Sequence, residues 1–137
     1  MIKRKSKFSK IKVGLKTKIK FKIKNKDIKN FIKSIGDKNQ LHLKKINING
    51  KKVYLCHGMF VASLVSRLLG TYFPLKKNLL ISINLNFKKP IYSDDLIFIE
   101  TKVINKSRIF PVITLNISIK KNNNEVINGE AKIKILF

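Results

Sequence analysis

The chain has very few acidic groups and very few residues that titrate near neutral pH. Only seven of its 137 residues are Asp or Glu, against 31 Lys or Arg, which gives a formal net charge of +24. There is no tryptophan, one cysteine and two histidines. The single Cys56 excludes an internal disulfide and suits a reducing compartment. A carboxylate within a few residues of a histidine is therefore an uncommon combination in this chain.

Long hydrophobic runs are also missing. The longest apolar segment, Met59 to Leu69, contains Ser63, Ser66 and Arg67 and is shorter than the roughly 20 residues of a membrane span. The basic residues 1–10 are not followed by the apolar stretch of a secretory signal. We therefore expect a cytoplasmic protein without a membrane span.

The excess of lysine allows two interpretations. Nucleic-acid binding proteins are basic, but a selected site would be expected to use arginine, of which there are only three. Lysine, isoleucine and asparagine, all with A/T-rich codons, make up 64 of the 137 residues, which indicates compositional bias. We expect no specific nucleic-acid partner, although the charge could attract an anionic substrate or carrier.

Hydrophobic patterning predicts one α+β domain at residues 11–137 after a basic extension at 1–10. A helix is expected to begin at Asn25 as its cap and to end at Gly36. A second helix, apolar almost all round, should run from 58 to 69, lie buried on all faces and end at Gly70. Residues 43–55 read as a polar loop. Alternation predicts strands at 11–24, 81–88, 96–104, 112–120 and 125–136, the last four as an antiparallel meander.

The loop after the first helix carries the main candidate site. Asp37 lies five residues before His42, and a carboxylate and an imidazole on one short loop can together activate a water molecule. The alternative is that Asp37, or Asn39 beside it, only caps a turn. Gly58 begins the apolar helix, where free backbone N–H groups can stabilise an oxyanion.

Two neighbours of Gly58 have less specific interpretations. His57 is either a hydrogen-bonded structural residue at a helix start or a further chemical group. Cys56 is better explained as a buried structural thiol than as a metal ligand, since no metal-ligand spacing accompanies it.

Four segments in the same order resemble one known family. They are FIKSIGDKNQLH at 31–42, CHGMFVASLVSRLLG at 56–70, FKKPIYSDD at 87–95 and NGEA at 128–131. The chain is similar from about residue 12 onward to the MaoC-like, (R)-specific enoyl-CoA hydratases. The resemblance implies a hotdog fold, a long central helix wrapped by a curled antiparallel β-sheet and paired as a homodimer.

The same resemblance implies an activity, the reversible addition of water to a trans-2-enoyl thioester of coenzyme A or acyl carrier protein. Asp37 and His42 match the catalytic pair and Gly58 the oxyanion-binding glycine, with no metal or redox cofactor. Ser66 matches a serine that supports the pair, although plain helix packing would also explain it. Asn39 and His57 are further supporting candidates.

One position departs from the family pattern. The family usually has proline where this chain has Gln40, and proline would stiffen the loop between Asp37 and His42. A non-catalytic hotdog protein that binds acyl thioesters, or a subunit of a larger complex, is therefore the alternative function.

Overall fold

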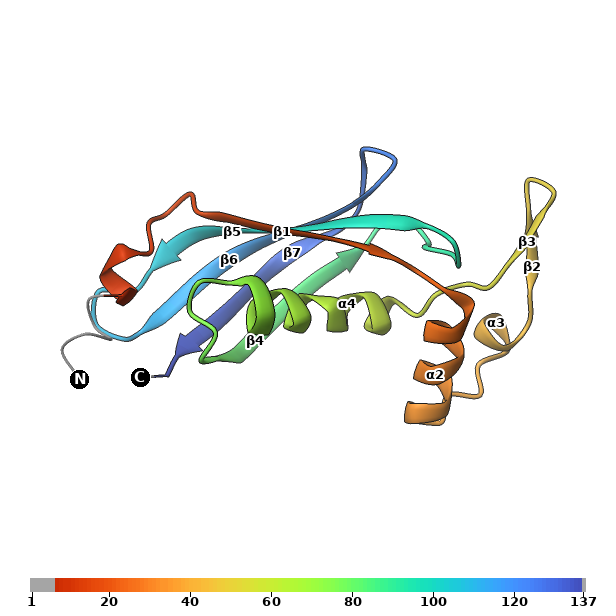
Figure 1. Ribbon diagram of the computed structural model, residues 1–137, viewed down its shortest axis with the longest axis horizontal. Helices are drawn as coiled ribbons and strands as arrows, with labels where there is room; N and C mark the ends of the chain where they lie inside the picture. The colour runs from red at the N-terminus through yellow and green to blue at the C-terminus, as the bar shows by residue number, and fades with distance from the viewer. Residues whose placement is uncertain (1–6, 137) are drawn as a thin grey trace.

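The computed structural model describes residues 7–136 as one helix-on-sheet unit with an arm at one end (Figure 1). The helix α4 lies along one face of a five-stranded sheet, and α2, α3 and the β2–β3 hairpin lie beyond the end of that sheet. We call residues 25–53 the arm. In chain order the elements are β1 (Lys16–Lys22), α2 (Asn25–Ile35), α3 (Gln40–Leu43), β2 (Ile46–Ile48), β3 (Lys51–Val53), α4 (Gly58–Arg67), the π-helical turn η1 (Leu68–Tyr72), β4 (Asn78–Phe87), β5 (Leu96–Lys106), β6 (Val112–Lys121) and β7 (Asn124–Ile135).

The strands are ordered β1-β5-β6-β7-β4, and all neighbours are antiparallel. The expected meander is correct for β5, β6 and β7 but wrong for β4, which pairs with β7 through registers such as Leu85 opposite Gly129. β1 occupies the other edge of β5, with Lys18 opposite Glu100. Because β1 already occupies that edge of β5, β4 cannot pair with β5 and lies at the edge of β7 instead.

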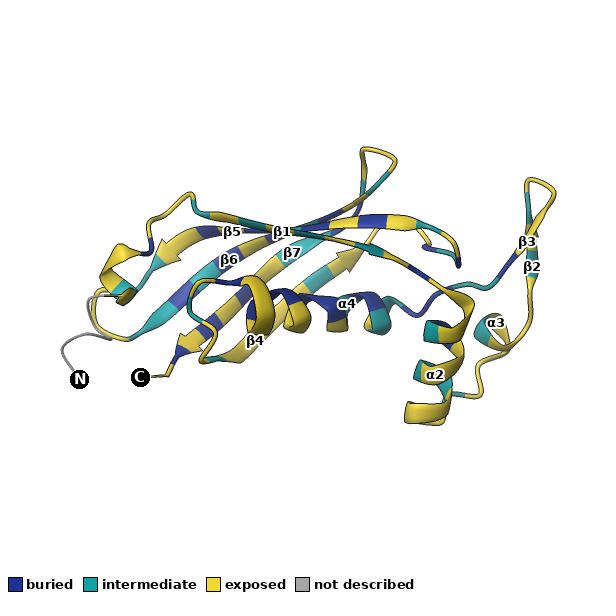
Figure 2. Cartoon of the chain, in the orientation of Figure 1, coloured by how far each residue is buried: buried dark blue, intermediate teal, exposed yellow. Residues whose placement is uncertain are grey.

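Alternating side chains of the sheet form the core together with one face of α4 (Figure 2). A fully buried large aliphatic side chain contributes about 1.5–3 kcal/mol, so this layer dominates the stability of the fold. It comprises Ile97, Ile99 and Val103 of β5, Ile113, Leu115, Ile117 and Ile119 of β6, Ile127, Ala131 and Ile133 of β7, and Val61, Leu64, Val65 and Leu68 beneath them.

The prediction that the central helix is buried on all faces is wrong for the single chain. Met59 is 67% exposed, and Ser63, Ser66 and Arg67 are also exposed. The reason is that the sheet covers only one side of α4. The apolar residues on its other side therefore need a different partner.

Three local predictions are corrected. Lys24, and not Asn25, occupies the cap position of α2, and Asp27 Oδ2 accepts a hydrogen bond from the Lys24 backbone N–H. The helical path continues through Gly70 as η1, because only Pro74 forces the residue before it into an extended conformation. Residues 43–55 contain the β2–β3 hairpin, which turns at Asn49–Gly50 with positive φ at both positions.

The start of the described chain lies against the sheet. Phe8 packs on the core, Ile11 is buried, and Lys106 Nζ donates to the carbonyl oxygens of both residues. Residues 1–6 of the basic extension fall outside the described part. Among residues 7–136, no helix combines the length and the hydropathy needed to cross a membrane.

Candidate active site

The loop between α2 and α3 holds Asp37 through its own backbone. Gly36 ends α2 as predicted, with φ of 70°, and its N–H donates to Ile32 O. Asp37 Oδ1 then accepts the Asn39 N–H at 2.8 Å. Asn39 Oδ1 in turn accepts the Leu41 N–H at 3.1 Å and caps the short helix that carries His42. Asn39 therefore links the positions of the two predicted catalytic residues.

His57, predicted only as a supporting residue, contacts both predicted catalytic groups. Its Nε2 lies 2.8 Å from Asp37 Oδ2. Its ring stacks on the ring of His42, with centroids 3.6 Å apart and planes 23° apart. His57 is buried, at 5% exposure, whereas Asp37 and His42 are partly exposed. The two histidines of the chain thus lie together with one of its seven acidic residues.

The hydrogen bonds fix the tautomers of both histidines. A carbonyl oxygen only accepts, so the 2.9 Å contact with Leu55 O places a proton on His42 Nδ1. Neutral His42 then keeps a lone pair on Nε2. The carboxylate of Asp37 likewise places a proton on His57 Nε2, and no partner for the buried His57 Nδ1 exists among residues 7–136.

The electrostatic environment favours a charged Asp37 and a neutral His57. The Asn39 N–H, followed by the His57 hydrogen bond, lowers the pKa of Asp37, against an opposing effect of burial. Burial lowers the pKa of His57, and the neighbouring His42 adds to this, while Asp37 opposes it. This arrangement favours a negative charge on Asp37 beside a neutral imidazole of His57.

The same three residues could be considered as metal ligands. One ligand atom from each of Asp37, His42 and His57 lies within 4.8 Å of the others. A metal ion must lie close to the plane of each imidazole that binds it. The two rings are stacked, with centroids 3.6 Å apart and planes 23° apart, so an ion bound in the plane of one ring would lie out of the plane of the other. This geometry suits proton transfer better than chelation.

A cavity of about 350 Å³ opens next to His42 and Gly58. Asp37 does not line it, so His42 is the member of the pair that faces the cavity. The remaining lining is largely apolar, with two lysines at one side. These residues are Leu55, Cys56, Val61, Phe87, Lys88, Lys89, Pro90, Ile91 and Ile127.

Gly58 is the first residue of α4 and lines the cavity. The first N–H groups of a helix have no intrahelical acceptor and carry partial positive charge. A Cβ at position 58 would lie 2.7 Å from Phe87 Cε1, so a side chain there would require this ring to move. Ser66 lies two turns further along α4, about 12 Å away, and is exposed. Within residues 7–136, no hydrogen bond joins Ser66 to Asp37 or His42.

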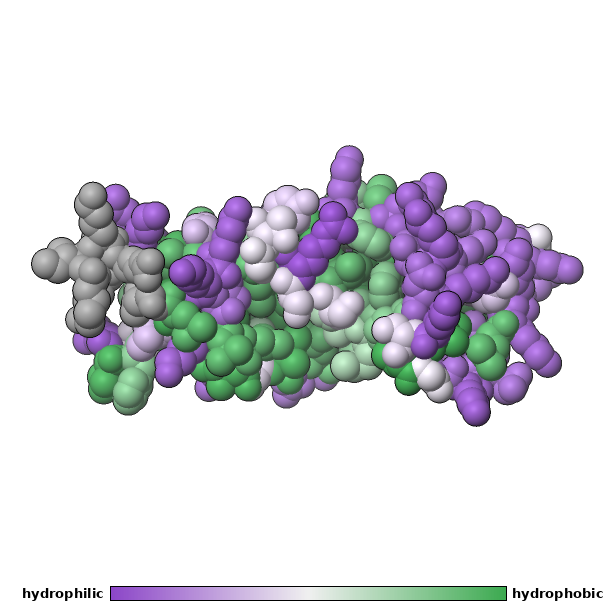
Figure 3. All heavy atoms as spheres, turned by 60° about the horizontal axis from the view of Figure 1, so that its bottom comes forward, coloured by the Kyte–Doolittle hydropathy of each residue, from purple (hydrophilic) through white to green (hydrophobic). Residues whose placement is uncertain are grey.

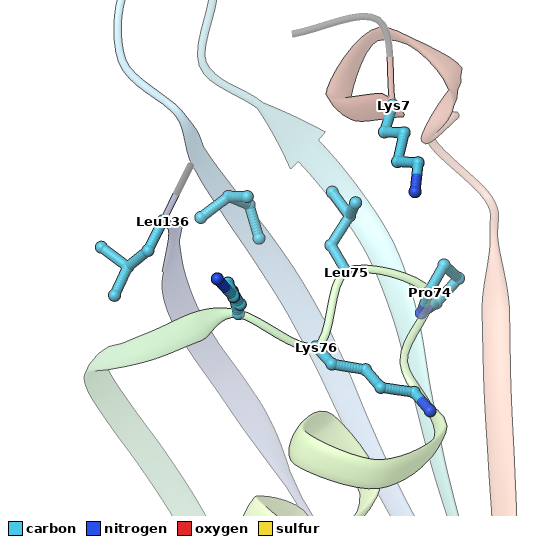
Figure 4. Close-up of a pocket in the computed structure, with 7 residues that line it drawn as sticks. Lys7, Pro74, Leu75, Lys76 and Leu136 are labelled. Carbon is cyan, nitrogen blue, oxygen red and sulfur yellow. The ribbon is translucent and has the colours of Figure 1, made fainter. Parts of the chain in front are cut away.

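A second cavity, of about 290 Å³, lies where Lys7 and Leu136, at the two ends of the described chain, come near residues 74–77 (Figure 4). Its lining combines Pro74, Leu75 and Leu136 with lysines, including Lys7 and Lys76. Its lining among residues 7–136 includes no histidine or carboxylate. The cavity at His42 combines a histidine with the N-terminus of α4 and is therefore the candidate active site.

Sequence reasoning missed two features of this site. It did not anticipate that Phe87 would lie against Gly58, because β4 is 29 residues away in sequence and its pairing was mispredicted. It also did not pair His57 with Asp37. The available signal for that contact was the position of His57 directly before the helix-starting Gly58.

The chain is similar in sequence to curated hydratases and dehydratases. It is 28% identical over 131 residues to the 3-hydroxybutyryl-CoA dehydratase of Methylorubrum extorquens, covering 93% of this chain and 83% of that protein. It is also 28% identical over 128 residues to the (R)-specific enoyl-CoA hydratase of Aeromonas caviae, covering 91% of this chain and 96% of that protein. No protein-family model matches the chain.

The fold agrees with the sequence comparison. The solved structure of the (R)-hydratase from Aeromonas caviae, described as involved in PHA biosynthesis, matches with a TM-score of 0.84 at 27% identity. That match covers 93% of this chain and 98% of the solved one. The expected hotdog fold is therefore confirmed, and so is the resemblance, in sequence and in fold, to the (R)-specific enoyl-CoA hydratases.

Proposed function

We propose that this protein is an enoyl-thioester hydratase, which in the reverse direction is a 3-hydroxyacyl-thioester dehydratase. One observation carries the proposal: His42 and the Gly58 backbone line the same cavity, with the Asp37 carboxylate fixed behind the histidines. The substrate class is a thioester of coenzyme A or acyl carrier protein. The reaction is redox-neutral and uses only these protein groups.

Hydration requires one proton acceptor next to the attacking water. His42 Nε2 has a free lone pair and belongs to the cavity wall, which supports giving it this role. As the water oxygen bonds to C3, His42 takes the water proton, the C2=C3 electron pair forms a C1=C2 bond, and the carbonyl electron pair moves to the thioester oxygen. His42 then returns the proton to C2. Asp37 stabilises the intervening imidazolium by its negative charge.

The negative charge on the thioester oxygen needs a donor. The Gly58 N–H, at the positive end of α4, is the proposed donor. Removing one such donor typically costs about 3–4 kcal/mol of transition-state stabilisation. Gly58 and His42 would thus act on opposite ends of the same conjugated system.

The thiol of Cys56 lines the cavity in which an electrophilic substrate would bind. Burial raises the pKa of Cys56 to about 12, and only the thiolate is strongly nucleophilic. The thiol therefore stays protonated and does not compete with water for C3. A lone reduced cysteine also suits the reducing compartment in which we place the enzyme, the cytoplasm.

We also propose that the protein is a homodimer built along β4. This strand is at the edge of the sheet, and its apolar side chains are exposed. Figure 3 shows hydrophobic surface on the side where α4 and β4 come forward, while hydrophilic residues gather over the arm. Unpaired strand edges and large apolar patches are typical of protein interfaces. The exposed set is Leu79, Leu80, Ile81, Ile83 and Phe87, with Met59 from α4.

The activity is tested by following the loss of enoyl absorbance when crotonyl-CoA is added. Wild type should turn over, and Asp37→Asn should be slower by at least about 100-fold, since it removes the charge that stabilises the imidazolium. Asp94→Asn is the matched control, because Asp94 lies in a turn and pairs with Lys51. Equal rates for wild type and Asp37→Asn would overturn the assignment. Acyl-CoA binding without turnover would support the non-catalytic alternative.

A further inference from the structure

We propose that His57 is a positioning residue that joins the acid–base pair to the oxyanion-binding helix. This inference rests on the proposed function. Its physical basis is that one buried side chain contacts Asp37 by a hydrogen bond and His42 by ring stacking. The backbone of the same residue precedes Gly58 directly.

The site is divided between two structural parts that need a connection. Asp37 and His42 belong to the arm, which lies beyond the end of the sheet, whereas Gly58 belongs to α4, which packs on the sheet (Figure 1). Residues 43–56 separate His42 from His57 along the chain. His57 crosses this boundary directly, since its side chain reaches into the arm from the N-cap position of α4.

Aromatic contacts hold the His57 ring in place from a second side. Phe31 of α2 packs edge-on against His57, with centroids 5.1 Å apart and planes 68° apart. The same Phe31 contacts Phe60 of α4 at 5.5 Å. The His57 ring therefore contacts both Phe31 and His42, and a rotation of this ring would disturb both contacts.

The hydrogen bond between His57 and Asp37 runs from the imidazole N–H to the carboxylate and favours the ionised form of Asp37. The titratable groups that face the His57 ring are Asp37 at its Nε2 and His42 on its face. A neutral His57 donates its Nε2 proton to Oδ2, so the carboxylate stays ionised and points at the histidine pair. The charge-assisted bond becomes stronger in the low dielectric around a buried ring. Losing it should loosen Asp37 and make its ionised form less favourable.

The test uses three substitutions that separate the donor from the ring. His57→Gln can place an amide N–H near the position of Nε2, His57→Asn is too short to do so, and His57→Phe keeps a flat ring without a donor. We expect His57→Asn and His57→Phe to lower kcat about 10- to 100-fold, the effect of losing a hydrogen bond to a charged group. KM should change less than kcat, and His57→Gln should recover most of the rate.

Two readouts distinguish positioning from simple structural support. In His57→Phe the side-chain carboxyl ¹³C signal of Asp37 should titrate at a higher pH than in wild type, because Asp37 loses a donor that lowers its pKa. Thermal unfolding of each variant reports stability separately. The inference is overturned if His57→Phe keeps the wild-type rate and the wild-type titration of Asp37. It is also overturned if Gln, Asn and Phe variants lose rate in proportion to stability alone.

A measurement without turnover separates this inference from the proposed function. In ¹⁵N-histidine NMR spectra of the free wild-type protein, His57 should be neutral and protonated at Nε2 near neutral pH. If wild type hydrates no enoyl thioester, the proposed function fails. The tautomer of His57 still tests whether its Nε2 donates a hydrogen bond to Asp37. A His57 protonated at Nδ1 would exclude donation to Asp37 and overturn the inference.

Discussion

Gly58 lies so close to the ring of Phe87 that a single added methyl group would come within 2.7 Å of Phe87 Cε1 and 2.9 Å of Cδ1. The proposed oxyanion donor and one wall of the cavity are therefore set by one contact between α4 and the edge strand β4.

This contact predicts that Gly58→Ala will lower hydratase activity, by about 10- to 1,000-fold, through displacement of the donor or of the cavity wall. The half-exposed Phe87 can move, so the loss of stability should be small. The double variant Gly58→Ala/Phe87→Leu should regain part of the rate, measured with crotonyl-CoA. An equal defect in the single and double variants would show that the clash is not the cause.

Removing the imidazole of His42 should abolish most of the catalysis. His42→Ala is expected to lower kcat by about 10²–10⁴-fold, the usual contribution of a positioned acid–base group. Since His42 is only partly buried, the midpoint of thermal unfolding should change little. Tyr72→Ala provides a control on an exposed side chain outside the cavity lining. A His42→Ala variant as active as this control would exclude His42 from proton transfer.

Stability should fall as the pH is lowered from 7.5 to 5.5. Burial lowers the pKa of His57 in the folded state, whereas the unfolded chain binds this proton with a pKa near 6.5. Below about pH 6.5 the unfolded state therefore takes up a proton that the folded state does not, so the free energy of unfolding decreases. Urea unfolding of His57→Gln, which cannot titrate at this position, should show a weaker pH dependence. The same slope in both proteins would contradict the shifted pKa.

Gly129 should be the glycine least tolerant of a side chain. A Cβ at this position of β7 would lie only 1.9 Å from the backbone oxygen of Asn84 in β4, and backbone cannot rotate away as a side chain can. Gly129→Ala should destabilise the fold by about 3 kcal/mol or more. Gly70→Ala is the matched control, because no atom lies within 4 Å of its added Cβ. Chemical denaturation of both variants tests this, and equal stabilities would contradict the β4–β7 register.

The proposed dimer predicts that a charge on β4 will produce monomers. Ile81→Lys or Ile83→Lys should lower the molar mass in solution, measured by light scattering, because a lysine at a buried interface carries an uncompensated charge. Ile109→Lys makes the same chemical change at an apolar residue that is 84% exposed between β5 and β6, and should stay dimeric. A wild-type protein that is monomeric at micromolar concentration would refute the proposal.

The sequence alone determined most of the local structure and the identity of the chemical groups. Alternation predicted the five strands of the main sheet, because in a half-buried strand every second side chain faces the core, but it missed the short β2–β3 hairpin. Gly36 predicted the end of α2, because the left-handed conformation there costs glycine least. The scarcity of acid and histidine made Asp37 and His42 conspicuous, and motif order led to the family resemblance that sequence and fold comparison then confirmed.

Only the tertiary structure decided how these parts meet. The partner strand of β4 depends on which sheet edge is left free once β1 has paired with β5, and that competition is not local in sequence. Whether α4 has an exposed side depends on how many layers pack against it. The hydrophobic periodicity of the helix sequence does not contain this information. The contacts of His57 with Asp37 and His42, and of Gly58 with Phe87, join residues 15 to 29 positions apart. Residue types thus follow from the sequence, whereas the hydrogen-bond partners of those residues follow from the packing of the arm and β4 against α4.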